Sequence, residues 1–198
     1  MCAHPNNHDS HCLHHGQRQT LESMSHILNG CNVYQGLYIA RHDRIVDIIT
    51  KYVSPMFYSS VLFYKQSCVK PEMFQCNDPH VFKGITANTP DVIVIDENNR
   101  EVFLWEVVCT FDSSLEEAFL TKQVKYHPLV QAIIHLGYKC QLIVFIFGSL
   151  GHVHRLEVRG LRIMRLSKCK AKQLATYCSI SSIIGSRAIW RRRCFLYP

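Results

Sequence analysis

The sequence predicts a mixed α/β fold, and three observations carry this prediction. β-Branched and aromatic runs at 91–96 and 101–110 flank a polar four-residue segment, which is a hairpin signal. A helical pattern follows near 113–136, and the continuously apolar run at 139–147 is typical of a strand buried on both faces. With a further helix expected near 42–53, the order is helix, hairpin, helix, strand around a central mixed sheet.

The predicted hairpin places two carboxylates beside each other. If Asn98 and Asn99 form the loop, opposed residues have numbers that sum to 197, so Asp91 faces Glu106. A four-residue loop over 97–100 gives the same register, whereas a three-residue loop would break it. Cross-strand Cβ atoms lie roughly 4.5–5.5 Å apart, and like charges at that separation destabilise a sheet. The pair is therefore either a stray one on a solvated strand end or part of a site.

The helix near 113–136 adds a lysine to the same face. Its expected core stripe consists of Leu115, Ala118, Phe119, Tyr126, Leu129 and Ile133. Lys122 lies about 20° from the centre of this stripe and Lys125 about 80° from it. A lysine is rarely fully buried unless it is paired, although its ammonium can also snorkel past a core to water. Pro128 should kink or end the helix.

Together, the two carboxylates and Lys122 form a plausible phosphoryl-transfer site. The acids would share a divalent cation that removes their repulsion, and the ammonium would stabilise an anionic nucleophile or a pentavalent phosphate. This arrangement resembles the PD-(D/E)xK restriction-like nuclease family, with Pro90 and Asp91 as the PD and Glu106 as the second acid. The family's usual lysine position, two residues past that acid, holds Val108.

One branch of that family carries its lysine on the following helix, within a Lys-x-x-Lys-Tyr pattern, as at 122–126 here. The branch is the endonuclease domain at the C-terminus of site-specific non-LTR retrotransposon polyproteins, including elements inserted in ribosomal RNA genes. The resemblance leaves open whether Lys122 or Lys125 is the catalytic lysine, and the helical phase favours Lys122. The chain contains no Tyr-x-Asp-Asp polymerase motif, so it would be a truncated or stand-alone copy without reverse transcriptase activity.

The resemblance implies a restriction-endonuclease-like core and a metal-dependent DNA endonuclease activity that exposes a 3′-hydroxyl for a polymerase. Asp91 and Glu106 would hold Mg²⁺ or Mn²⁺, Lys122 would stabilise the developing charge, and Lys125 and Tyr126 would position the backbone. The implied location is nuclear. The implied partners are target DNA and, as a further candidate, the element RNA; no small-molecule substrate is implied.

A second motif resembles the zinc knuckle that these elements place upstream of the nuclease. His26 and Cys31 have the spacing of its second half, whereas the first half is irregular, with Cys12 and His15 in place of two cysteines. These four residues are still an acceptable tetrahedral ligand set for a structural Zn²⁺. The alternative is that the His-rich start is disordered and the knuckle has decayed.

The chain divides into a His/Cys-rich zinc-knuckle-like segment at 1–40, a nuclease core at 41–150 and a basic helical extension at 151–198. The extension carries a net charge of +10. Because the whole chain carries +7, the first 150 residues together carry −3. A local excess of this kind suits contact with phosphates. The residues predicted to make that contact are Lys168, Lys170, Lys172, Arg187, Arg191, Arg192 and Arg193. Helical spacing predicts that the extension packs on the core through Leu174, Tyr177, Ile180 and Ile184.

Composition excludes several other classes of protein. With 198 residues, 47% of them hydrophobic, the chain is about one ordinary domain with appendages. It has no apolar run long enough to span a membrane, and its first residues do not form a signal peptide. Ten cysteines without a secretory signal indicate reduced thiols. The rival hypotheses are an inactive retrotransposon remnant or domesticated zinc-dependent nucleic-acid-binding protein, and a structural interaction protein that merely retains the fold and shows no salt-dependent DNA binding at all.

Overall fold

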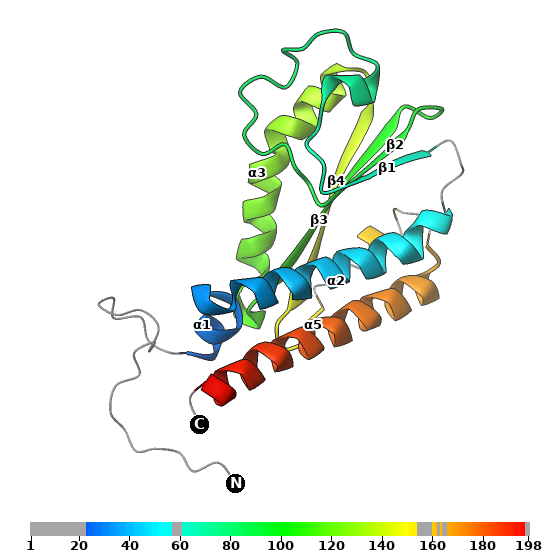
Figure 1. Cartoon of the computed structure of the whole chain (residues 1–198). Helices are drawn as coiled ribbons and strands as arrows, with labels where there is room; N and C mark the ends of the chain where they lie inside the picture. The colour runs from blue at the N-terminus through cyan, green and yellow to red at the C-terminus, as the bar shows by residue number, and fades with distance from the viewer. Residues whose placement is uncertain (1–22, 57–60, 154–159, 162, 164–165, 197–198) are drawn as a thin grey trace.

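The computed structural model describes residues 23–56, 61–153, 160, 161, 163 and 166–196 (Figure 1). Its helices are α1 (Met24–Asn29), α2 (Gln35–Val53), α3 (Leu115–His135) and α5 (Lys168–Leu196). Its strands are β1 (Val61–Lys65), β2 (Val92–Asp96), β3 (Glu101–Thr110) and β4 (Lys139–Gly148). Short 3₁₀ turns lie between several of these elements. No described helix is both long and apolar enough to cross a lipid bilayer.

The strands form one mixed sheet in the order β1-β2-β3-β4. The pairs β1/β2 and β2/β3 are antiparallel, whereas β3 and β4 run parallel because α3 returns the chain between them. Ile95 pairs with Val102 and Ile93 with Leu104, so the predicted hairpin register is confirmed. The loop has four residues, 97–100, and it closes with Arg100 in the left-handed region at φ 52°. The predicted mixed α/β class is therefore also confirmed.

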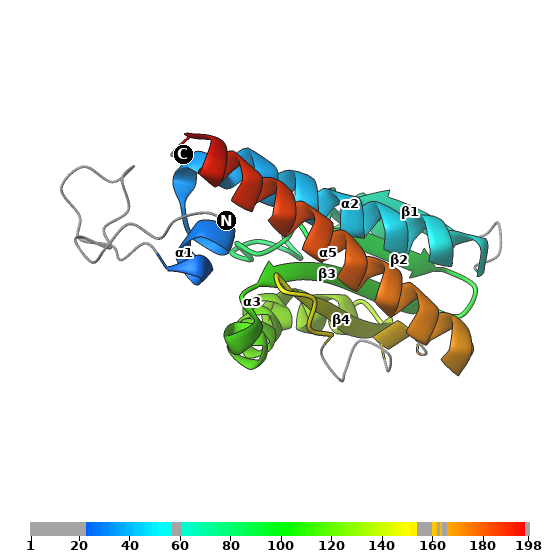
Figure 2. The same cartoon turned by 90° about the horizontal axis from the view of Figure 1, so that it is seen from below.

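Helices cover both faces of the sheet (Figure 2). One face carries Val92, Phe103 and Trp105, which pack with α2 and α5. The other face carries Ile93 and Leu104, which pack with α3 through Leu129 and Ile133 and with the 69–87 segment. Because side chains alternate along a strand, the two layers draw on alternate residues of the same strands.

Helix α3 follows the predicted stripe, with Leu115, Tyr126, Leu129 and Ile133 buried. The helix does not end at Pro128 but continues to His135, so the expectation that Pro128 ends it is wrong. A proline removes the hydrogen bond to the carbonyl four residues earlier, which is that of Val124. Pro128 is exposed and Val124 is 75% exposed, so water can replace the missing donor.

Helix α5 does not pack as predicted. Leu174 is buried, but Tyr177, Ile180 and Ile184 are 46%, 47% and 46% exposed. The buried face consists mainly of small residues, including Ala171, Ala175, Cys178, Ser182 and Ser186. The reason is a close approach to α2, because a Cβ added at Gly185 would lie only 2.8 Å from Cβ of Arg41. Large side chains cannot enter an interface this tight, so the bulky apolar residues point outward.

The described parts of the two outer zones belong to the same packed unit as the core. Helix α2 begins at Gln35 and so crosses the expected boundary at position 40. Helix α5 lies along α2 in both views (Figures 1 and 2). A third apolar cluster joins Leu28 of α1, Tyr34 and Ile189 of α5.

Candidate active site

Three predicted residues from three elements come together at one edge of the sheet. Asp91 immediately precedes β2, Glu106 lies in β3 and Lys122 lies in α3. Because β2 and β3 are antiparallel, the start of β2 lies beside the C-terminal half of β3. The backbone N–H of Val107 donates to Asp91 Oδ2 at 2.7 Å, and Lys122 Nζ donates to Glu106 Oε1 at 2.5 Å. Hairpin register and helical phase are therefore sufficient to assemble this group.

Glu106 is a buried carboxylate with half of its hydrogen-bonding capacity unused. It is 4% exposed, and its Oε2 has no hydrogen-bond partner among the described residues. Burying a charged oxygen without a partner costs free energy, and two neighbouring carboxylates add repulsion. A cation that prefers oxygen ligands would remove both penalties.

Asp91 and Glu106 are the residues that could hold such a cation. Mg²⁺ is often bound by one or two carboxylates while it keeps several waters. Within the described ranges, no cluster of three or more His, Cys, Asp or Glu side chains could hold a metal ion. Two carboxylates alone would leave most of the coordination of a Mg²⁺ or Mn²⁺ ion to water.

His42 is a site residue that the sequence analysis missed. It projects from α2, and its Nε2 lies 3.1 Å from Asp91 Oδ2 and 3.1 Å from the Val107 carbonyl oxygen. Its Nδ1 lies 3.0 Å from Asp43 Oδ1. Burial lowers the pKa of His42, but the hydrogen bonds and charges of Asp91 and Asp43 outweigh it and raise that pKa to about 9. Each acid of the pair thus has its own cation, His42 for Asp91 and Lys122 for Glu106.

Tyr126 and Lys125 form the outer part of the site. Tyr126 is buried and donates its hydroxyl proton to the Thr89 carbonyl at 3.0 Å. Burial, the negative charge of Glu106, a hydrogen-bonding interaction with that carboxylate and the charge of Asp91 raise the pKa of Tyr126 far above its ordinary value, so the phenol stays neutral. Lys125 is exposed and donates to the Tyr126 hydroxyl at 3.3 Å. Of the two candidate lysines, Lys122 contacts the Glu106 carboxylate, whereas Lys125 lies at the surface and contacts the Tyr126 hydroxyl.

Half of the predicted zinc set lies outside the described residues, namely Cys12 and His15. The other half is compact, because His26 lies in α1 and Cys31 follows directly, with the Cys31 N–H donating to the His26 carbonyl at 2.9 Å. Cys31 is buried and forms no disulfide. The zinc set remains a prediction.

The basic residues of α5 form two clusters at opposite ends of the helix. Lys168, Lys170 and Lys172 are exposed in its first turns, and Arg187, Arg191 and Arg192 are exposed near its end. Arg193 is half-buried. At 1.5 Å per residue, about 22 Å along the helix axis separates the nearest members of the two clusters.

No family model matches this chain, and the search of curated proteins found no match. The case for a function therefore rests on the geometry of Asp91, Glu106, Lys122 and His42.

Proposed function

We propose that this protein is a Mg²⁺- or Mn²⁺-dependent DNA endonuclease of the restriction-like, retrotransposon type. One observation carries the proposal: Glu106 Oε2 is buried without a partner beside Asp91, while Lys122 occupies Glu106 Oε1. A purely structural ion pair between Lys122 and Glu106 needs neither a second carboxylate nearby nor an unused buried oxygen on Glu106. The Lys-x-x-Lys-Tyr pattern at 122–126 supports the same class.

The residues present have distinct roles in this proposal. Asp91 and Glu106 hold the divalent cation, which when bound would polarise the phosphate and lower the pKa of a water. Lys122 places a positive charge where a phosphate would carry developing negative charge. His42 orients Asp91 through Nε2, and Tyr126 anchors the segment before Asp91 through Thr89. Lys125 is exposed and suited to a backbone phosphate.

The setting that the resemblance implies completes the proposal. The nick would expose a 3′-hydroxyl in target DNA for a polymerase absent from this chain, and the location would be nuclear. Element RNA is a further candidate partner.

A plasmid assay tests the proposal directly. Purified protein is incubated with supercoiled plasmid in an excess of MgCl₂ or MnCl₂, or in EDTA. We expect open-circle product with either metal, none with EDTA, and recovery when Mg²⁺ is added back in excess. Equal nicking with EDTA, or none with either metal, would contradict the proposal.

The arginine cluster near the C-terminal end of α5 favours DNA binding, whether or not the protein is catalytic. If Arg187, Arg191 and Arg192 each touch a phosphate, replacing all three with Gln should flatten the slope of log K against log salt by about 2.7, at roughly 0.9 per contact. Binding should weaken about equally for all sequences. Replacing Lys168, Lys170 and Lys172 with Gln measures separately the contribution of the predicted cluster at the other end of the helix. If the arginine variant keeps the wild-type slope, the arginine cluster does not contact DNA.

Zinc in the N-terminal segment is the second metal of the proposal. If Cys12, His15, His26 and Cys31 bind it, protein purified without chelator should contain about one zinc per chain. A Cys31→Ser variant should lose the metal, whereas Cys169→Ser, which changes an exposed thiol, should keep it. Elemental analysis gives the stoichiometry. A wild-type chain free of zinc would refute the site.

A further inference from the structure

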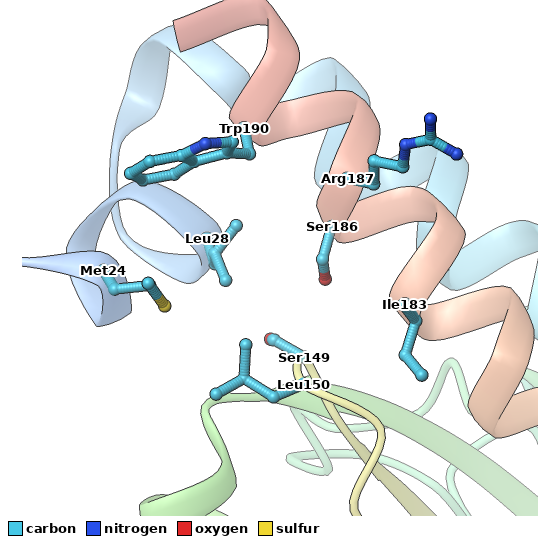
Figure 3. A pocket seen from close by; sticks show the side chains of 8 residues that line it. All are labelled: Met24, Leu28, Ser149, Leu150, Ile183, Ser186, Arg187 and Trp190. Atoms are coloured by element: carbon cyan, nitrogen blue, oxygen red, sulfur yellow. The ribbon is translucent and has the colours of Figure 1, made fainter. Parts of the chain in front are cut away.

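A cavity of about 280 Å³ lies between α1, α5 and the loop after β4 (Figure 3). Leu28, Leu150 and Ile183 supply apolar walls, and Trp190 presents its indole ring. The polar lining consists of Ser149, Ser186 and Arg187; in Figure 3 the Ser186 side chain points into the space and Arg187 points away from it. Both serines are almost fully buried, at 1% and 5% exposed.

Behind the two serines lies a buried guanidinium. Arg41 is 3% exposed, and its Nη1 donates to Ser186 Oγ at 2.8 Å and to Ser149 Oγ at 3.2 Å. Its Nη2 donates to Asn29 Oδ1 at 2.8 Å. Within the described part of the chain, no carboxylate pairs with Arg41. A buried cation without an acid gives the serine end of the cavity a positive potential.

The two serines differ in the acceptors available to their protons. The Ser149 hydroxyl has two acceptors, Asn29 Oδ1 at 2.7 Å and the Thr110 carbonyl oxygen at 2.9 Å. Ser186 Oγ accepts from Arg41, and no described group accepts the Ser186 proton. The cavity therefore offers one buried donor, Ser186 O–H, strengthened by the cation behind it. A ligand must bring an acceptor atom to that point.

The cavity and the rim restrict the class of ligand. Its volume is at the small end for ligand pockets, which suits one planar ring. Trp190 offers a ring face for stacking, and the apolar walls suit the other faces of such a ring. On the outer side of α5, Arg187 and Arg191 lie one turn apart, are exposed and line the same neighbouring groove, which suits the phosphates of a flanking segment. An unstacked nucleobase in a single strand meets all three conditions.

The cavity is adjacent to the candidate active site through two consecutive residues. Arg41 contacts the cavity serines, and His42 contacts Asp91. Ser149 Oγ also lies 2.9 Å from the carbonyl oxygen of Thr110, at the end of the strand that carries Glu106. Both sites therefore lie at the same edge of the sheet.

We propose that this cavity receives one unstacked base of single-stranded DNA, which stacks on Trp190 and accepts a hydrogen bond from Ser186, with flanking phosphates on Arg187 and Arg191. The choice of DNA rests on the proposed function. The inference adds a single-stranded segment to the substrate and a residue, Trp190, that recognises it.

Binding is measured in EDTA, by anisotropy of a labelled single-stranded 12-mer of mixed sequence. Stacking on one aromatic ring is worth enough that Trp190→Ala should weaken affinity roughly 5- to 150-fold. Trp190→Phe should recover most of the loss, and Ser186→Ala should weaken affinity by roughly 2- to 10-fold. The control is Tyr177→Ala, which removes an exposed ring of α5 outside the cavity and should leave affinity unchanged.

A second readout uses the indole itself. Trp105, the only other tryptophan, is 1% exposed and gives a constant background, so quenching by the oligonucleotide reports Trp190. We expect quenching by the 12-mer and little by an abasic oligonucleotide of equal length or by a blunt duplex. Equal affinity for the abasic chain, or an unchanged affinity of Trp190→Ala, would overturn the proposal.

Failure of the two proposals can be told apart. Binding is measured in EDTA, where no metal-dependent cleavage is expected. If the protein nicks plasmid with Mg²⁺ but binds the abasic and the normal oligonucleotide equally, only the base-cavity proposal fails. If the protein prefers the normal oligonucleotide to the abasic one but never nicks plasmid, only the nuclease proposal fails.

Discussion

Glu106→Gln is expected to lower Mg²⁺-dependent plasmid nicking by at least about a thousandfold. Glutamine keeps the shape of the side chain but removes the negative charge that would hold the cation. Metal-assisted charge stabilisation is worth several kcal/mol, and each 1.36 kcal/mol corresponds to a tenfold change in rate. Asp91→Ala should have a comparable effect on nicking and should leave DNA affinity largely intact. Nicking at the wild-type rate in either variant would eliminate the assignment of that residue.

The matched control is Glu101→Gln, which makes the same substitution at the other end of the same strand. Glu101 pairs with Asp96 in the register, far along β3 from Asp91, and its replacement should leave nicking unchanged. A general loss of activity in both variants would indicate damage to the strand and would not implicate a metal site.

Thermal stability separates a metal site from a structural carboxylate. In wild type, Mg²⁺ at a hundred times its dissociation constant should stabilise the fold by about 2.7 kcal/mol, because it binds the native state alone. Glu106→Gln should abolish this shift. In EDTA the variant loses the ion pair with the partly exposed Lys122 but also removes a buried charge with an unsatisfied oxygen, so its stability should stay within about 1 kcal/mol of wild type. A large loss of stability in EDTA would contradict this interpretation.

The part of the site that sequence reasoning predicted depends on short-range regularities. The hairpin register follows from a four-residue loop between two β-branched runs, and it placed Asp91 beside Glu106. The helical period placed Lys122 on the face that meets the sheet. Both rules act within about thirty residues of chain, and neither needs knowledge of how distant elements pack.

The parts that sequence reasoning missed depend on how distant elements pack. His42 reaches Asp91 from a helix 49 positions earlier in the chain, and no spacing rule links the two. The outward orientation of Tyr177 and Ile180 follows from the tight approach of α2 and α5 at Gly185. A pattern of large apolar residues normally marks the buried face of a helix, and here a row of Ala, Ser and Gly replaces it.

The two candidate lysines should differ sharply when each is replaced with Met. Lys122→Met removes the ion-pair partner of Glu106. Because the Glu106 side chain is only 5% exposed, its negative charge is then buried without compensation. Breaking a fully buried pair costs about 3–5 kcal/mol. Because the Lys122 side chain is 26% exposed, we expect a smaller loss, about 1–3 kcal/mol in EDTA. Mg²⁺ should restore much of this stability by taking over the charge of Glu106.

Catalysis should not recover with stability in the Lys122→Met protein. Removing one charge-stabilising donor from a site of this kind typically costs 10²- to 10³-fold in rate, and the metal does not replace a donor at that position. Lys125→Met changes an exposed residue, so its stability should stay within about 0.5 kcal/mol of wild type. If Lys125 touches a phosphate, its loss should also flatten the salt dependence of binding by about one contact. Denaturant melts with and without Mg²⁺, read beside nicking rates, distinguish the two. The opposite pattern, with Lys125→Met inactive and Lys122→Met fully active, would transfer the catalytic role to Lys125 and leave Lys122 as the structural counter-ion of Glu106.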